Sequence, residues 1–257
     1  MTSAPRSFAA VAATILLAFS SPAPARAQNM SAPQRAEIES IIKGYLLAHP
    51  EVLHEALAEL EKRQTAAEAE KHQAAVKDNA QTLFNSSRQV VLGNPQGDTT
   101  LVEFFDYNCS FCKRAMADML DLLKNDPKLK IVLKEFPVLG EGSVQAAQVS
   151  VAVRMQDKTG KKYLDFHQKL LGGRGQADRA HALAVAKEVG MDMTRLEKDM
   201  AGDEVKASLE ESFKLADALG LTGTPSYVVG SNIVIGAVGL AALKEKVNTA
   251  RCGKTIC

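Results

Sequence analysis

The chain of 257 residues has no tryptophan, few aromatic residues and a formal net charge of only +1. Near-neutral charge gives no electrostatic basis for binding nucleic acid, so we predict no nucleic-acid partner. The 5% aromatic content argues against a carbohydrate-binding or base-stacking surface. Beyond the N-terminus, no apolar run approaches the roughly 20 residues that a membrane-spanning helix needs. What is present, 46% hydrophobic and 24% charged residues, is ordinary globular composition.

The first residues have the pattern of a cleavable secretory signal. Arg6 precedes an apolar run over residues 8–19, and residues 25–27 form an A-x-A cleavage site. The run is about a dozen residues long, which is short for a spanning helix. We predict that residues 1–27 are a signal peptide removed after Ala27, with an uncleaved anchor as the alternative. The mature protein is then expected in an oxidising compartment, where cysteines favour disulfides.

Residues 28–88 are predicted to be an N-terminal helical extension. Apolar residues follow one helix face from residue 33, and Pro50 suits the first turn of a second helix. A four-three spacing, typical of a short coiled-coil seam, then runs through Leu53, Leu57, Leu60, Gln64 and Ala67. Because these helices have little to bury against each other, we predict an oligomerisation stalk that forms a homodimer or homotrimer. A helix pair packed on its own domain is the alternative.

The remaining chain has the element order of a split α/β domain. The expected strands are 90–92, 100–105, 130–136, 226–229 and 233–235, and the expected helices are 109–124, 143–156, 161–171, 177–189, 193–200, 204–219 and 240–250. The first strand–helix–strand unit should be right-handed with parallel strands. We therefore predict an α/β thioredoxin fold over residues 89–251, with an inserted helical domain at about 141–221.

Cys109-Ser110-Phe111-Cys112 lies at the turn between the strand that ends at Phe105 and the following helix. Two cysteines separated by two residues can close a small disulfide ring. The first cysteine sits where a helix N-terminus stabilises a thiolate, which is the nucleophile of disulfide exchange. The motif therefore indicates redox chemistry. Taken by itself, it also allows a short structural disulfide or half of a zinc site.

A proline directly precedes the strand predicted at 226–229. Proline cannot donate to a sheet ladder, so its presence at a strand start needs a special reason. In a thioredoxin architecture the loop with Thr224 and Pro225 lies beside the C-x-x-C turn. A cis bond between them would free the Thr224 backbone to pair with an extended substrate. An ordinary trans-proline turn is the alternative.

Glu103 is an acid in the middle of the otherwise apolar strand at 100–105. Burying a carboxylate is costly, so such a residue is either turned outward or functional. Beneath the cysteines, Glu103 with a raised pKa could exchange a proton with the Cys112 thiol in each turnover. An exposed edge position is the alternative, and Lys134 on the neighbouring strand is a candidate ion-pair partner.

Cys252 and Cys257 form a second pair in the C-terminal tail, residues 252–257. We predict a small structural disulfide, as expected in an oxidising compartment. A thiolate pair for copper(I) and a redox relay to Cys109 are the alternatives. The five histidines are scattered without ligand spacing, so we predict no cofactor and no resident metal.

These motifs, in this order, resemble those of the DsbA-like thiol:disulfide oxidoreductases of bacterial periplasms. The resemblance covers residues from about 90 to 250 and rests on residues 102–113, the helical insertion and residues 223–225. The leader around residues 46–53 is similar to that of the suppressor-of-copper-sensitivity C (ScsC) group, whose members can trimerise through their N-terminal helices and act as disulfide isomerases. Relatives commonly carry Pro-Tyr or Pro-His where this chain has Ser110-Phe111. The reduction potential is therefore open between about −270 and −120 mV.

The resemblance implies that Cys109 is the exposed, attacking thiol and Cys112 the resolving thiol, in the periplasm. It also implies clients that are unfolded or misoxidised secreted proteins, and a membrane partner that reduces or reoxidises the pair. We therefore predict a protein disulfide oxidoreductase, with isomerase activity as the finer prediction. The alternatives are a copper(I)-binding thiol protein involved in copper tolerance, a monomeric dithiol oxidase, and a chaperone-like scaffold.

Overall fold

The computed structural model describes residues 30–157 and 159–257, so the predicted signal peptide lies outside the described residues. Two compact units make up the chain, one reaching Glu59 and the other running from Leu60 to Cys257. Within the described ranges, no helix is both long enough and apolar enough to cross a membrane.

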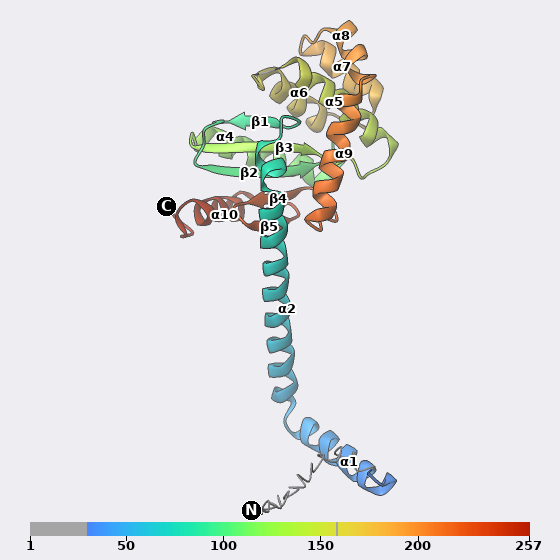
Figure 1. Ribbon diagram of the computed structural model, residues 1–257, viewed down its shortest axis with the longest axis vertical. Helices are drawn as coiled ribbons and strands as arrows, with labels where there is room; N and C mark the ends of the chain where they lie inside the picture. Colours follow the sequence, from blue (N-terminus) through green and yellow to red (C-terminus); the bar gives the residue numbers. More distant parts are fainter. Residues whose placement is uncertain (1–29, 158) are drawn as a thin grey trace, which may run out of the picture. The chain divides into compact units, whose positions relative to one another are not determined.

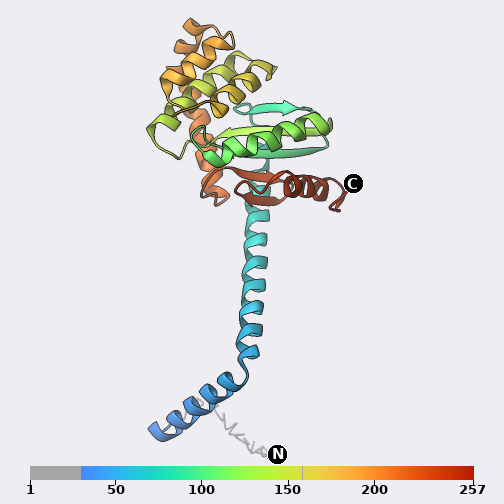
Figure 2. The same ribbon diagram turned by 180° about the vertical axis from the view of Figure 1, so that it is seen from behind.

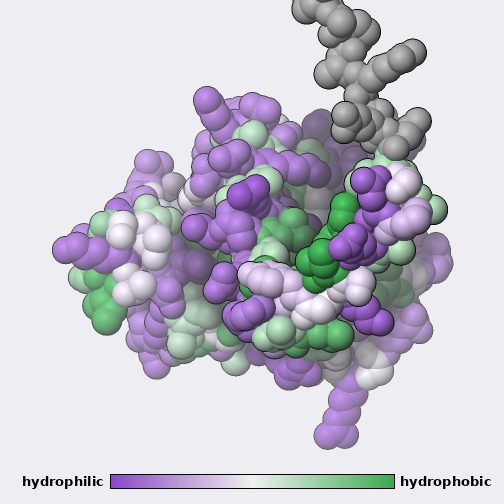
Figure 3. Space-filling view, turned by 90° about the horizontal axis from the view of Figure 1, so that it is seen from below, coloured by the Kyte–Doolittle hydropathy of each residue, from purple (hydrophilic) through white to green (hydrophobic). Residues whose placement is uncertain are grey.

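The first unit contains α1 (Ala32–Ala48) and the start of α2 (Pro50–Asp78). Ser31 caps α1 through a capping box with Gln34, and Pro50 opens α2 as predicted. No residue of α1 is buried. The large hydrophobic residues that this unit exposes are Met30, Ile38, Ile41, Ile42, Tyr45, Leu47, Leu53 and Leu57. The foreground of Figure 3 shows hydrophobic residues (green) beside hydrophilic ones (purple) on this unit.

The second unit is built on a five-stranded sheet in the order β1-β3-β2-β4-β5 (Figure 1). Its elements after α2 are α3 (Ala80–Asn85), β1 (Val90–Gly93), β2 (Thr99–Phe105), α4 (Ser110–Asn125), β3 (Leu129–Glu135), α5 (Glu141–Gln156), α6 (Lys161–Gly172), α7 (Arg179–Glu188), α8 (Met193–Met200), α9 (Asp203–Ala218), β4 (Ser226–Val229), β5 (Asn232–Ile235) and α10 (Leu240–Cys252). Strands β2 and β3 are parallel and the other pairs are antiparallel. The predicted βαβ unit and the central position of β2 are confirmed.

The two faces of the sheet carry different helices. Helices α4 and α10 and the inserted helices α5 to α8 pack on the face that includes Leu101 and Phe105, as Figure 2 shows for α4. Helix α9 packs on the face that includes Val102 and Phe104. Side chains alternate between these faces along each strand. A site residue on β2 therefore meets either α4 or α9, according to its position in the register.

This alternation corrects the proposed pairing between Glu103 and Lys134. In the parallel register Glu103 lies opposite Leu133, whereas Lys134 lies opposite Phe104 and points to the other face. The fully buried Nζ of Lys134 donates to the Thr82 carbonyl at 2.9 Å and pairs with Glu211 at 3.3 Å. Lys134 therefore joins the sheet to α3 and α9, and it has no contact with the acid that we expected it to meet.

The end of the helical extension belongs to the core of the second unit. Val76 of α2 and Leu83 of α3 are buried in the cluster that includes Val102 and Phe104. The compact units divide between Glu59 and Leu60, within α2. Only two large apolar residues in this segment are buried, which is too weak a pattern for the sequence to reveal the packing.

The inserted domain is organised around α5, which contacts α6, α7, α8 and α9. Nine of its residues are buried, and they are mostly small: Gly142, Ser143, Ala146, Ala147, Val149, Ser150, Val151, Ala152 and Val153. Small side chains allow neighbouring helices to approach α5 on several sides. The five helices predicted for this insertion are all present, with ends that differ by at most two residues.

Candidate active site

The C-x-x-C motif begins α4 at the carboxyl end of the central strand β2. Cys109 is the N-cap residue of α4, and Cys112 lies in its first turn, fully buried. We expected Cys109 to be exposed, but only 5% of its surface is accessible. Its thiol donates to the carbonyl oxygen of Thr224 at 3.1 Å. The loop that approaches from β4 therefore shields Cys109, a contact between residues that are far apart in the sequence.

The Thr224–Pro225 peptide bond is cis, as predicted. Two hydrogen bonds hold the loop around it: the Ser226 hydroxyl donates to the Gly223 carbonyl at 2.7 Å, and the Gly236 N–H donates to the Pro225 carbonyl at 2.8 Å. The β4–β5 hairpin thus supports the segment that faces Cys109. The structure brings Cys109, Thr224 and Pro225 together from opposite ends of the domain.

Glu103 lies on the central strand with 4% of its surface accessible, so the exposed edge alternative is wrong. Burial, reinforced by the charge of Asp118, raises the pKa of Glu103 to about 8. Burial and then the charge of Glu103 raise the pKa of the Cys112 thiol. The predicted raised pKa of Glu103 is confirmed. The charge of Glu103 opposes ionisation of Cys112, which couples the protonation of Cys112 to that of Glu103.

Asp106, which we did not single out from the sequence, organises the loop before Cys109. Its buried carboxylate accepts hydrogen bonds from the N–H groups of Asn108, Val138 and Leu139 and from the Ser143 hydroxyl, at 2.7–3.0 Å. The Cys109 N–H donates to the Asp106 carbonyl at 3.1 Å. These four hydrogen bonds tie the loop before Cys109 to residues 138–139 and to α5. The side chain of an aspartate often accepts the N–H two residues later and forms an Asx turn. An aspartate directly after the end of a strand is the sequence signal for this turn.

The helical insertion is attached to both sides of the C-x-x-C motif. Before the motif, the Asn108 side chain accepts from the Ala177 N–H at 2.7 Å and donates to the Ala177 carbonyl at 2.8 Å. After the motif, the Lys113 Nζ donates to the Gly173 carbonyl at 3.1 Å. The segment from Gly173 to Ala177 is therefore tied to the residues on either side of the motif. These long-range contacts leave no signature in the local sequence.

A buried polar cluster lies between the sheet and the inserted helices. The Ser150 hydroxyl and the Tyr163 hydroxyl both donate to the Glu135 carboxylate. The Tyr107 hydroxyl contacts Ser150 at 2.9 Å and the His167 Nδ1 at 3.3 Å. Burial raises the pKa of Glu135 to about 8 and lowers the pKa of His167 to about 3. We singled out neither His167 nor Glu135 from the sequence.

Exposed side chains occur in the motif and in the loop that Asp106 binds. Phe111, inside the motif, is 52% exposed, and the Arg114 guanidinium carbon lies 4.4 Å from the centre of its ring. Val138 and Leu139 are also exposed, and their N–H groups are the ones bound to Asp106. The segments next to Cys109 therefore carry exposed side chains that can contact a polypeptide.

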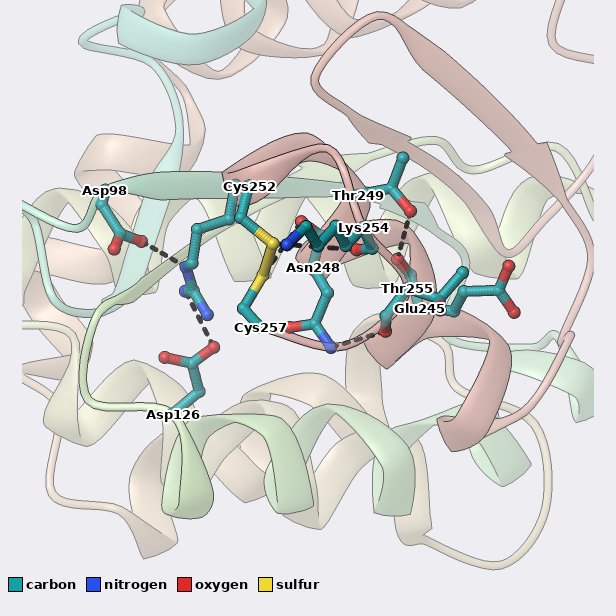
Figure 4. Close-up of a disulfide and its surroundings, with 10 residues drawn as sticks. Asp98, Asp126, Glu245, Asn248, Thr249, Cys252, Lys254, Thr255 and Cys257 are labelled. Carbon is teal, nitrogen blue, oxygen red and sulfur yellow. Dashed lines mark hydrogen bonds and ion pairs between the residues drawn. A yellow bond between two sulfur atoms is a disulfide. The ribbon is translucent and has the colours of Figure 1, made fainter.

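Cys252 and Cys257 are joined by a disulfide (Figure 4). It closes the tail at the end of α10, where the Asn248 side chain donates to the Thr255 carbonyl at 2.9 Å. The neighbouring Arg251 bridges Asp98 and Asp126.

This disulfide lies far from the active-site cysteines. Asp126, which Arg251 contacts, ends α4, whereas Cys109 begins it. The 16 residues of α4 span about 24 Å, so the proposed relay to Cys109 cannot occur by direct contact within one chain. Among the described residues, no group of three or more metal-binding side chains could hold a metal ion.

Three features define a thioredoxin-fold protein with a dithiol site. They are a C-x-x-C motif with buried thiols at the start of a helix, a cis-proline that faces it, and a central pair of parallel strands. The family model described as DSBA-like thioredoxin domain matches residues 100–248, and the chain belongs to this family. A second model, the copper resistance protein ScsC N-terminal domain, matches residues 34–67.

Solved structures share the fold. A thioredoxin-like oxidoreductase from Silicibacter pomeroyi is 46% identical, with a TM-score of 0.63 over 66% of this chain and 96% of that one. Proteus mirabilis ScsC in a compact conformation is 27% identical, with a TM-score of 0.62 over 85% of this chain and 98% of that one.

Curated relatives show the same domain in different settings. A probable disulfide bond formation protein D from Bacillus cereus is 24% identical over 61% of this chain and 77% of its own length. A Na(+)/H(+) antiporter NhaA 1 from Salinispora arenicola is 24% identical over 65% of this chain, and the match spans about a quarter of the antiporter's length. The homologues support thiol:disulfide oxidoreductase chemistry.

Proposed function

We propose that this protein is a periplasmic thiol:disulfide oxidoreductase that exchanges disulfides with secreted proteins through Cys109 and Cys112. The observation that carries the proposal is the contact between the Cys109 thiol and the Thr224 carbonyl beside the cis-proline. An extended client strand can pair with the Thr224 backbone, which places its sulfur at Cys109. Other enzymes with C-x-x-C motifs use the same separation of an attacking and a resolving thiol.

In the oxidising direction, a client thiolate attacks the Cys109 sulfur of the Cys109–Cys112 disulfide. A mixed disulfide forms with Cys109, and Cys112 leaves as a thiolate that takes a proton from Glu103. The second client thiolate then attacks the client sulfur of the mixed disulfide, and Cys109 leaves. The client gains a disulfide and the protein holds two thiols. The reverse sequence opens a wrong client disulfide, with Glu103 accepting the Cys112 proton.

A test of the chemistry is the reduction of insulin by a dithiol reductant, followed by turbidity, in the presence of this protein. We expect Cys109→Ser to abolish the acceleration, because no nucleophile remains at the opening. The matched control is Cys252→Ala combined with Cys257→Ala, which removes the other two cysteines and is expected to retain the acceleration. Wild-type acceleration by Cys109→Ser would contradict the proposed role.

We further propose that the protein is a homo-oligomer, trimeric or dimeric, and acts as a disulfide isomerase. The exposed apolar residues of α1 and α2, such as Ile41 and Leu57, support self-association, as does the match to the ScsC N-terminal domain. An isomerase benefits from several sites around a shared cleft. It also needs its cysteines kept reduced by a membrane redox partner, whereas a partner that reoxidises them would favour the oxidase reaction.

Light scattering of the mature protein tests the assembly. We expect an oligomer for the wild type and dissociation for Ile41→Glu combined with Leu57→Glu, because charges on a buried apolar seam are costly. Lys43→Gln is a control on α1, the helix of Ile41. It adds no charge to the apolar face and should leave the oligomer intact. A monomeric wild type would remove the structural case for an isomerase and leave a monomeric dithiol oxidase.

Copper(I) binding is the second candidate function. Cys109 and Cys112 are free thiols within one helical turn, and thiolates are suitable ligands for copper(I). The family model that matches residues 34–67 is that of a copper resistance protein. Titration of the reduced protein with copper(I) in competition with a chromogenic chelator tests it. Binding lost in Cys109→Ser would support this function, and no competition with the chelator would exclude it.

A further inference from the structure

Asn108, the residue before Cys109, joins the start of the C-x-x-C motif to the inserted helices. Its side chain accepts from the Ala177 N–H at 2.7 Å, and it donates to the Ala177 carbonyl at 2.8 Å and to the Ser143 hydroxyl at 2.9 Å. We call these three hydrogen bonds the Asn108 clamp. The amide oxygen has one partner and the amide nitrogen has two, which uses the full donor capacity of the group.

The partners of the Asn108 clamp are buried and packed on α5. Ser143 and Ala177 each have at most 2% of their surface accessible. Ala177 lies directly against the first turn of α5, because a Cβ added to Gly142 would come within 3.2 Å of the Ala177 carbonyl oxygen. Ser143, in the same turn, also donates to the Asp106 carboxylate at 2.8 Å. Asn108 is therefore fastened to a closely packed part of the insertion.

The main chain on both sides of Asn108 is fixed as well. The Asn108 N–H donates to the Asp106 carboxylate at 2.7 Å, and the Cys109 N–H donates to the Asp106 carbonyl at 3.1 Å. Cys109 is the N-cap of α4, and its carbonyl accepts from the Lys113 N–H at 3.1 Å. The residue that the clamp holds thus directly precedes the helix start. Its position determines how the Cys109 sulfur lies relative to the helix N-terminus and to the Thr224 carbonyl.

The clamp has more to hold in the dithiol form of the site than in the disulfide form. A disulfide between Cys109 and Cys112 fixes Cys109 to α4 by a covalent bond. Both cysteines are free thiols in this structure, so here noncovalent contacts hold the Cys109 sulfur at the start of the helix. The partial positive charge of a helix N-terminus stabilises a thiolate. Stabilisation of the reduced form makes a C-x-x-C site a stronger oxidant.

We propose that Asn108 is a positioning residue of the dithiol site, whose clamp on Ala177 and Ser143 stabilises the reduced form more than the oxidised form. The clamp thereby makes the disulfide between Cys109 and Cys112 more oxidising toward client thiols. The inference rests on the proposed exchange function, and it names a residue through which the inserted helices bias the direction of exchange.

The test measures the redox equilibrium with glutathione, in a protein that also carries Cys252→Ala and Cys257→Ala. The reduced protein and one glutathione disulfide give the disulfide of Cys109 with Cys112 and two reduced glutathiones, so two electrons leave the protein. Mass spectrometry after alkylation of free thiols gives the oxidised fraction at each glutathione ratio. For Asn108→Ala we expect the equilibrium constant of this reaction to rise about two- to five-fold, the range that a contact with a helix N-terminus supplies.

Asn94→Ala is the matched control. Asn94 is half-buried, as Asn108 is, and its side chain also binds a segment at one end of α4. It donates to the carbonyl of Pro127 at 3.1 Å, and Pro127 follows the C-terminal end of that helix. We expect Asn94→Ala to keep the equilibrium constant of the background protein, because it loosens the end of α4 that lies away from the cysteines.

Urea unfolding of the oxidised and reduced forms is an independent readout. A residue with only a structural role stabilises both forms equally, so its loss lowers both unfolding free energies by the same amount. Asn108→Ala should lower the stability of the reduced form more than that of the oxidised form. Because the unfolded chain has no clamp to lose, thermodynamic linkage requires this excess to match the change in the glutathione constant.

An unchanged or lower constant for Asn108→Ala, or equal destabilisation of both oxidation states, would overturn the proposal. A rise of the same size in Asn94→Ala would also overturn it, because the effect would then reflect general loosening of α4. If Asn108→Ala does not fold, Ser143→Ala decides, since it removes one bond of the clamp: a smaller rise supports the proposal and an unchanged constant overturns it. Failure of the wild type to reduce insulin would instead contradict the proposed exchange function, whatever the glutathione constant.

Discussion

Replacement of Glu103 by glutamine should change stability in a strongly pH-dependent manner. The carboxyl is buried on the central strand, and its pKa is about 8 in the folded protein against an ordinary 4.5. Between these values the folded state binds a proton that the unfolded state has released. The stability of the wild type therefore falls as pH rises from about 4.5 to about 8. Glutamine has nearly the same shape and cannot ionise, so it removes this dependence.

The size of the effect follows from the shift in pKa. Each pKa unit corresponds to about 1.4 kcal/mol, so a shift from 4.5 to about 8 amounts to about 5 kcal/mol as an upper bound. At pH 4.5 the acid is protonated in the folded state and only half ionised in the unfolded state, so Glu103→Gln should leave stability within about 1 kcal/mol of the wild type. At pH 9 the variant should be more stable by several kcal/mol, up to that bound.

Urea unfolding of wild type and variant at pH 4.5, 7 and 9 measures the difference directly. Glu135→Gln is a matched control, because Glu135 is also buried with a pKa of about 8 but lies in the cluster with Ser150 and Tyr163. Both variants should gain stability at high pH. Only Glu103→Gln should slow disulfide exchange, by about 100-fold, because only Glu103 is coupled to the Cys112 thiol.

Two results would refute the reasoning. An equal difference in unfolding free energy at pH 4.5 and pH 9 would show that Glu103 does not titrate with a raised pKa. An unchanged exchange rate in Glu103→Gln, with the stability effect present, would leave Glu103 buried and titrating but remove it from proton transfer to Cys112.

Three further predictions follow from the packing of the second unit. Asp106→Asn turns an amide NH2 toward backbone donors and should lower the free energy of unfolding by about 2–4 kcal/mol, and an unchanged urea midpoint would contradict this. A chain starting at Gln89 should be less stable than one starting at Leu60 by about 3–6 kcal/mol, since it lacks the buried side chains of α2 and α3, and equal melting temperatures would oppose that. Cys252→Ala with Cys257→Ala should cost about 2 kcal/mol or less, as measured by thermal melting, and a loss of exchange activity would be inconsistent with the distance to the active site.

Local patterns were sufficient for most elements of the fold. The strands at β2 and β3, the helix after the cysteines and the five inserted helices follow from hydrophobic periodicity and from proline and glycine punctuation within a few residues. The C-x-x-C motif, the proline before β4 and the acid in β2 are also local features. Each of them could therefore be singled out before any spatial arrangement was known.

The ScsC-like leader was a harder case. Its helices and the break at Pro50 were predictable, because capping and proline act locally. The division of the units within α2 was not, since the burial of Val76 and Leu83 depends on the sheet face that they meet. Polar residues dominate this stretch, and the two buried side chains form no periodic pattern of their own.

What the sequence determined by itself was the chemistry of this protein: two cysteines at a helix start, a proline before a strand and an acid among apolar residues. Only the tertiary structure decided how these groups are used. It shielded Cys109 with the Thr224 carbonyl, turned Lys134 away from Glu103, and bound Asp106 to three separate segments. The physical reason is that hydrogen bonds, register and burial join residues far apart in the chain, whereas periodicity and motifs report only on neighbours.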